Sequence, residues 1–155
     1  MLVVLVAIPL AVGALGGLAT AGNVDGWYSD AQKAPWTPPN VVFGPVWTAL
    51  YALMGVASWL VWRRRHPGAR PALVAYVAQL VLNSVWSPMF FAGYPALGPA
   101  ALWLGLGIIV ALSIALIVTI VLAARVSRVA AVLLAPYLLW VLFASSLNAY
   151  LALAN

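Results

Sequence analysis

The sequence has no cysteine, only two acidic residues and a single histidine among its 155 residues. Without cysteine there can be no disulfide, no thiolate nucleophile and no sulfur-ligated metal centre. Charged residues make up 6% of the chain, whereas about a quarter of a typical soluble protein is charged. So few charges cannot cover a water-facing surface of normal size, which excludes a soluble globular domain.

Hydrophobic residues, by contrast, make up 66% of the chain. Four stretches contain no Asp, Glu, Lys or Arg: 1–24, 34–62, 71–124 and 129–155. A helix needs about 20 apolar residues to cross a membrane, so the third stretch is long enough to cross twice. Gly93-Tyr94-Pro95 and Gly98-Pro99 break that stretch. We therefore predict an all-α integral membrane protein, a five-transmembrane-helix bundle in one domain, 1–155. The predicted spans are about 2–22, 43–62, 72–93, 99–124 and 129–152.

The positions of the charges predict the topology of these spans. All six arginines lie in the 63–71 and 125–128 segments, which five spans place on the same side of the membrane. Arginine-rich loops face the cytoplasm in most membrane proteins. We expect a multi-pass protein of the cell membrane with its Arg loops in the cytoplasm and its C-terminus outside. The formal net charge of +5 therefore indicates orientation and no nucleic-acid partner.

Polar and aromatic side chains share one face in each of three spans. A polar group within hydrocarbon must find a partner or line a cavity. Helical spacing groups Trp47, Leu50, Tyr51 and Met54; Asn83, Trp86, Ser87 and Phe90; and Trp140, Phe143, Ala144, Leu147 and Asn148. All three faces lie at the same depth, beneath the 23–42 loop with its Trp27-Tyr28, Pro35-Trp36 and Pro38-Pro39 pairs. We predict a ligand pocket that this loop caps.

Some of the aromatic and asparagine residues have structural roles that require no ligand. Interfacial aromatic residues often form a belt that anchors helices at the headgroup level, and we assign Trp59, Trp62, Trp103 and Tyr76 to such a belt. Asn83 and Asn148 fit a second role equally well, as hydrogen-bonding groups that join helices. In the first span, the small residues Gly13, Gly17 and Ala21 predict close packing against a helix of this chain or of a second protomer.

Four ordered blocks carry a resemblance to a known family. They are Trp27-Tyr28 followed by 33–39, the 42–51 segment, the 79–91 segment, and Pro136 to Trp140 with Leu147-Asn148. Through them the chain resembles the TspO/MBR family of translocator proteins, tryptophan-rich sensory proteins and peripheral-type benzodiazepine receptors. The resemblance covers nearly the whole chain. It implies a five-helix bundle that forms homodimers and binds tetrapyrroles such as protoporphyrin IX and haem, and in some members sterols or benzodiazepine-type ligands.

The resemblance also implies which residues contact the ligand. The family's contact positions fall on Tyr28, Trp47, Asn83, Trp86, Trp140, Phe143 and Leu147. With the depth argument, the predicted ligand-binding residues are Tyr28, Trp36, Trp47, Tyr51, Asn83, Trp86, Phe90, Trp140, Phe143, Ala144, Leu147 and Asn148. We expect no obligatory cofactor and no metal; porphyrin or haem is the expected ligand, and membrane lipid and a second copy are the expected partners. Tyr150 lacks a following basic residue, which argues against sterol recognition by the motif of animal members.

The few ionisable residues limit the chemistry. Asp25 and Asp30 are the only side-chain carboxylates, and the predicted topology separates them from His66 by the membrane. No nucleophile with a base, carboxylate pair or metal-ligand cluster can form, so we expect no dedicated enzyme. The spans also lack a proton relay, which disfavours active transport. A receptor or sensor that regulates tetrapyrrole fate is the main hypothesis. The alternatives are a passive translocator of porphyrin or sterol-like ligands, a light-dependent porphyrin-degrading enzyme, and a structural protein that binds no ligand.

Overall fold

A computed structural model describes residues 1–155, and all of its regular secondary structure is helical, with no strands. Five helical segments are long and apolar enough to cross a membrane, which confirms the predicted all-α bundle of five spans. The long helices are α1 (Leu2–Asp25), α3 (Asn40–Trp62), α4 (Ala69–Ser87), α6 (Pro99–Val126) and α7 (Arg128–Ala154). The short ones are α2 (Trp27–Asp30), the π-helix η1 (Pro88–Ala92) and α5 (Tyr94–Leu97).

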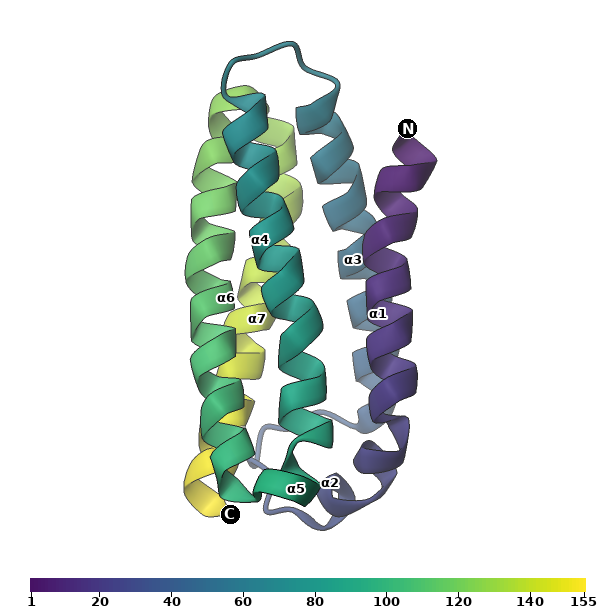
Figure 1. Ribbon diagram of the computed structural model, residues 1–155, viewed down its shortest axis with the longest axis vertical. Coiled ribbons are helices and arrows are strands. Elements are labelled where there is room, and N and C mark those ends of the chain that lie inside the picture. The colour runs from purple at the N-terminus through teal and green to yellow at the C-terminus, as the bar shows by residue number, and fades with distance from the viewer.

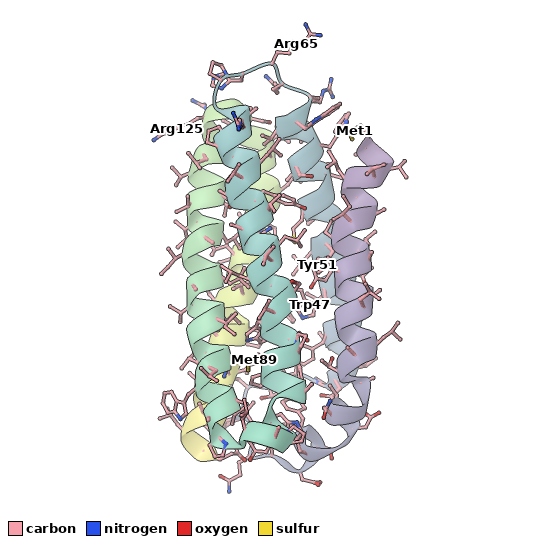
Figure 2. All side chains as sticks on the ribbon, in the orientation of Figure 1. Met1, Trp47, Tyr51, Arg65, Met89 and Arg125 are labelled. Carbon is pink, nitrogen blue, oxygen red and sulfur yellow. The ribbon has the colours of Figure 1, made fainter.

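The two ends of the bundle differ in what they carry (Figure 1). Met1, the connection between α3 and α4, and the turn between α6 and α7 lie at one end, which we name the Arg end because Arg65 and Arg125 mark it in Figure 2. α2, α5 and Asn155 lie at the other end, which we name the lid end. Five consecutive crossings produce this arrangement of loops and termini.

The helices pack as a tight block with a looser edge. α6 packs along both α4 and α7, and Leu102, Leu112 and Leu116 on α6 are fully buried between them. α1 packs mainly along α3 and touches α4 much less, so it stands at the edge of the bundle in Figure 1. The fully buried Tyr137 joins the core from α7. The weak contact between α1 and α4 leaves room inside the bundle on that side.

Local sequence signals explain where the helices begin and end. Gly98 has a φ of +57°, and Pro99 follows it at the first position of α6, where the missing proline N–H costs nothing. The Ser127 side chain accepts a hydrogen bond of 3.3 Å from the Ala130 N–H and caps α7. The third span changes its helical form at Pro88. There the helix widens into η1, because proline has no N–H to continue the α-helical pattern.

The capping loop is shorter than the predicted 23–42 segment. α1 continues to Asp25 and α3 begins at Asn40, while α2 takes up four residues between them. The third span begins at Ala69, three residues before the predicted start, because Pro71 fits the first turn of a helix, where its missing N–H removes no intrahelical hydrogen bond.

Candidate functional site

A cavity of about 570 Å³ lies in the lid-end half of the bundle, enclosed by α1, α3, α4, η1 and α7, with α2 over it. This volume lies within the range of roughly 300–1,000 Å³ that small-molecule sites occupy. Most lining residues are apolar. Nine of the twelve predicted ligand-binding residues line it: Tyr28, Trp47, Tyr51, Asn83, Trp86, Phe90, Ala144, Leu147 and Asn148.

Two pairs of stacked rings form one wall of the cavity. The Trp47 ring stacks on Tyr51 with ring centres 5.5 Å apart, and the Trp86 ring stacks on Phe90 at 5.6 Å. The two pairs meet where Trp47 and Trp86 lie 6.2 Å apart. Figure 2 places Trp47 and Tyr51 inside the bundle, between α1 and α4. Flat aromatic faces of this kind favour a flat, unsaturated ligand.

Three predicted residues, Trp36, Trp140 and Phe143, do not line the cavity. Trp36 is 52% exposed on the segment after α2, and its indole N–H donates to Ser146 Oγ at 3.3 Å on the outer side of α7. Trp140 shares a helical face with Ala144, as predicted, but it lies one turn farther from the lid end. There it packs against the Trp47 ring at 6.5 Å and against Phe143 at 5.4 Å. These two residues therefore form a second layer behind the cavity wall.

Hydrogen bonds to two asparagines that line the cavity join the helices around it. Tyr51 Oη donates to Asn83 Oδ1 at 2.7 Å, and Asn83 Nδ2 donates to Tyr137 Oη at 3.0 Å, so α3, α4 and α7 are tied together. This tyrosine–asparagine–tyrosine network is buried.

The second asparagine, Asn148, accepts from the Trp86 indole N–H at 3.2 Å and donates to the Leu102 carbonyl at 2.9 Å. Gly105 makes this contact possible, because a Cβ there would lie 3.2 Å from Asn148 Oδ1. Both asparagines therefore join helices through hydrogen bonds, and both also line the cavity, so each has both of the roles considered from the sequence. They do not bond to each other.

The wall formed by α1 was not predicted. Gly16 and Gly17 line the cavity and face open space, while the Thr20 hydroxyl turns back to the Gly16 carbonyl at 2.8 Å. Gly13 has the packing role expected of the small-residue stripe, because a Cβ there would overlap the Tyr51 ring. The glycines in the sequence could have predicted this wall. A helix face without side chains leaves room for a bound ligand as well as for a packed neighbouring helix. Other unpredicted lining residues include Phe43, Thr48, Ser84, Phe91 and Leu151.

The α2 helix covers the cavity through a buried tyrosine. Tyr28 is buried and lines the cavity, and burial raises the pKa of its phenol, which therefore stays neutral at physiological pH. Beside it, Trp27 stacks on Tyr94 with ring centres 3.9 Å apart and donates from its indole N–H to the Phe91 carbonyl at 2.8 Å. The Lys33 ammonium lies 5.0 Å from the Tyr28 ring centre. These contacts fix α2 to η1 and α5.

A second clamp holds the segment after α2 to the end of α7. The Gln32 N–H donates to Asn155 Oδ1 at 3.0 Å, and Asn155 Nδ2 donates back to the Gln32 carbonyl at 3.2 Å. Both groups are exposed at the lid end. The cover is thus held on two sides, by Trp27 and by Asn155.

One residue assigned to the aromatic belt lies elsewhere. Trp62 and Trp103 are about half exposed, as lipid-facing belt residues would be. Tyr76 is instead buried within the bundle, at 7% exposure. The earlier start of α4 explains the difference, because it places Tyr76 two turns inside the helix instead of at its end.

The cavity contains hydroxyl, amide and indole groups but no charged side chain. Asp25 and Asp30 lie at the lid end, on the far side of the bundle from His66 at the Arg end. The arrangement therefore provides apolar contact and neutral hydrogen bonds, which suit binding of a largely hydrophobic molecule.

Comparisons with known proteins identify a family and several proteins of similar sequence. The model of the TspO/MBR family matches residues 5–153. The chain is 42% identical to the tryptophan-rich protein TspO of Archaeoglobus fulgidus, over 94% of this chain and 91% of that protein. It is 38% identical to the translocator protein of Bos taurus, over 91% and 82%, respectively. It is 34% identical to the tryptophan-rich sensory protein of Cereibacter sphaeroides, over 87% and 82%.

Proposed function

The chain belongs to the TspO/MBR family, and we propose that this multi-pass membrane protein is a receptor or sensor that binds a porphyrin in the cavity beneath α2. The observation that carries the proposal is the uncharged cavity of about 570 Å³ with the stacked Trp47–Tyr51 and Trp86–Phe90 pairs on one wall. A planar macrocycle buries a large apolar area against such rings at little cost in conformational entropy.

The polar edge of the ligand fits the lid end. A porphyrin carries propionate groups, which are costly to bury without partners. Lys33 is the only lysine of the chain, and its ammonium lies over the Tyr28 ring that covers the cavity. We therefore place the macrocycle among the aromatic rings and its propionates toward Lys33 and water.

The chemistry of the lining favours binding through the ring system. No lining residue is His, Met or Cys, the side chains that most often ligate haem iron. The proposal therefore expects protoporphyrin IX and haem to bind with affinities within a few-fold of each other. A preference for haem by a factor of a hundred would indicate an axial ligand and contradict this mode of binding.

A sensor is supported over a passive translocator by what lies beyond the cavity. On the Arg-end side of the cavity, the buried hydrogen-bond network of Tyr51, Asn83 and Tyr137 crosses the bundle. The fully buried Met54 lies one helical turn from Tyr51 in the direction of the Arg end. A translocator needs a continuous path through this region. For the degrading enzyme, the cavity offers tryptophans as electron donors but no acid or base, so the ligand's own photochemistry would have to drive the reaction.

The charges support an orientation in the cell membrane with the Arg end in the cytoplasm. The arginines lie at one end and both aspartates at the other. Cysteine labelling tests this directly, because the chain has no native cysteine. In intact cells, an impermeant thiol reagent should label an Asp30→Cys variant and spare a Pro67→Cys variant. The opposite pattern would reverse the proposed orientation.

The binding proposal is tested by titrating the protein in lipid nanodiscs with protoporphyrin IX in the dark, following tryptophan quenching. A Gly17→Leu variant keeps every tryptophan and places a side chain in the cavity, where the glycine now faces open space. We expect saturable quenching in the wild type and at least a tenfold loss of affinity in this variant, with its melting temperature unchanged. Trp103→Ala, which removes an exposed tryptophan outside the cavity, is the matched control and should keep the affinity. Quenching that never saturates, or that Gly17→Leu leaves intact, would mean partitioning into lipid.

A further inference from the structure

A buried amide outside the cavity is left without hydrogen-bond partners. Gln79 lies in the middle of α4 with no exposed surface, and neither its Nε2 nor its Oε1 has a partner. In the membrane interior no bulk water compensates such a group, and an unpaired amide is costly there. A fully buried side chain with this cost calls for an explanation in terms of what it binds.

A second unpartnered group lies on the same face of the helix. Tyr76 precedes Gln79 by three residues, so both side chains point from the same side of α4. The Tyr76 hydroxyl is buried and has no partner. Ser58 on α3 lies near this hydroxyl, but it donates to the Gly55 carbonyl at 2.9 Å and keeps only its acceptor capacity free. Tyr76 and Ser58 thus lie together, and Gln79 lies one turn along the same face of α4, in the Arg-end half of an otherwise apolar core.

These residues continue a polar stripe that begins at the cavity. Tyr76, Gln79, Asn83 and Trp86 follow one another at helical spacing along α4, over about 15 Å. Asn83 and Trp86, which line the cavity, each donate a hydrogen bond, to Tyr137 and Asn148, respectively. Only the two members toward the Arg end are unsatisfied. The difference points to an occupant beside Gln79 and Tyr76 that lies beyond the cavity, whose lining includes neither residue.

The chemistry of the three side chains limits that occupant to something small and neutral. They offer amide and hydroxyl groups but no carboxylate or imidazole, so a cation there would be an uncompensated charge in hydrocarbon. Water both donates and accepts, and a buried water typically makes about three hydrogen bonds to groups that would otherwise be unsatisfied. We propose that Tyr76, Gln79 and Ser58 form a binding site for internal water within the Arg-end half of the bundle. This site does not depend on porphyrin binding.

Solid-state NMR of the full chain in lipid bilayers tests the site. The chain has two glutamines, Gln79 and the exposed Gln32 of the lid end, so glutamine-selective ¹⁵N labelling gives two side-chain amide signals. A Gln79→Met variant identifies the buried one. Magnetisation from water should reach the side-chain amide of Gln79 faster than the backbone N–H of the same residue, which the labelling also reports, and Gln32 serves as the hydrated control. Transfer to Gln32 alone would overturn the proposal.

The sign of two stability changes provides an independent check. If water bridges the pair, Gln79→Met and Tyr76→Phe each remove a bonded group and should each lower the melting temperature by about 2–4 °C. The double variant should lose less than the sum, because both changes remove the same water. If the two groups are simply unpaired, each change removes an unsatisfied polar atom and raises the melting temperature. Additive increases of this kind would overturn the proposal.

Discussion

The two halves of the bundle use the same residue type for opposite purposes. In the Arg-end half, Gly55 brings the backbones of α3 and α1 together, since a Cβ there would overlap Val6 Cα. In the lid-end half, Gly16, Gly17 and Gly44 line the cavity with open space in front of them. Glycines on membrane helices are usually taken as packing sites. The comparison shows that glycines also line a cavity where no neighbouring helix packs against them.

The changeover between the two halves occurs at Tyr51. Its ring fills the space beside Gly13, and its hydroxyl bonds to Asn83. Toward the Arg end of this residue α1 and α3 are in close contact at Val6 and Gly55, and toward the lid end both helices line the cavity. Substitutions at glycines on the Arg-end side of Tyr51 should therefore have different consequences from substitutions at glycines on its lid-end side.

The largest expected effect is that of Gly55→Leu. The new side chain has to displace the α1 backbone at Val6, which should destabilise the protein by about 3 kcal/mol. Thermal unfolding in nanodiscs measures the loss. Gly16→Leu is the matched control, because its side chain enters the cavity and should change stability by no more than about 0.5 kcal/mol. Equal losses in both variants would contradict the distinction between a packed and a hollow half.

Asn83→Ala should have the next largest effect on stability, because it removes the hydrogen bonds that join α3, α4 and α7 on the Arg-end side of the cavity. Both tyrosine hydroxyls, of Tyr51 and Tyr137, lose their partner, at a cost of about 2 kcal/mol. Adding Tyr51→Phe and Tyr137→Phe to the Asn83→Ala variant should recover part of the melting temperature, since no unpaired hydroxyl is then left. A triple variant less stable than the single one would show that the network contributes through packing instead.

The contrast between the cavity wall and the layer behind it predicts different losses of ligand affinity. Trp86→Ala removes a ring that lines the cavity and should weaken protoporphyrin IX binding about tenfold, or about 1.4 kcal/mol. Trp140→Ala removes a ring of the second layer and should weaken it less than about threefold. Titration followed by porphyrin absorbance avoids any dependence on tryptophan fluorescence. A larger loss at Trp140 would mean that the ligand displaces Trp47 and reaches the second layer.

The fold could be predicted from the sequence because charge and apolar length determine it almost alone. The charge-free stretches and the Gly-Pro breaks between 93 and 99 are sufficient to count five spans. The cavity-facing sides of α3, α4 and α7 were also predictable, since polar residues such as Asn83 and Asn148 mark the interior side of a membrane helix.

The residues that were missed are of two kinds. Some lie on a helix with few polar residues to mark its interior side, and for others the position along the bundle depends on where a helix begins or how two helices are shifted. α1 is apolar over most of its surface, so only its glycines and Thr20 mark the side that faces the interior, and the polar-face argument used for the other helices does not apply to it. The depth of Trp140 relative to Trp47 depends on how α3 and α7 are shifted along each other, which helical spacing does not determine. Tyr76 was misplaced because α4 begins at Ala69, three residues before the predicted start.

The smallest expected effect concerns the clamp at Asn155, which lies at the surface of the lid end. Asn155→Ala removes both bonds to the Gln32 backbone, and because these bonds are exposed to water the loss should be only about 0.5 kcal/mol. Hydrogen exchange at the Gln32 N–H should accelerate, and porphyrin should dissociate about twofold faster, because the Trp27 contact still holds α2. Ser29→Ala, which removes a hydroxyl bonded only within the cover, is the matched control. If both variants release porphyrin at the same rate, the Asn155 clamp does not restrain the cover, and the contacts of Trp27 and Trp36 hold the cavity closed.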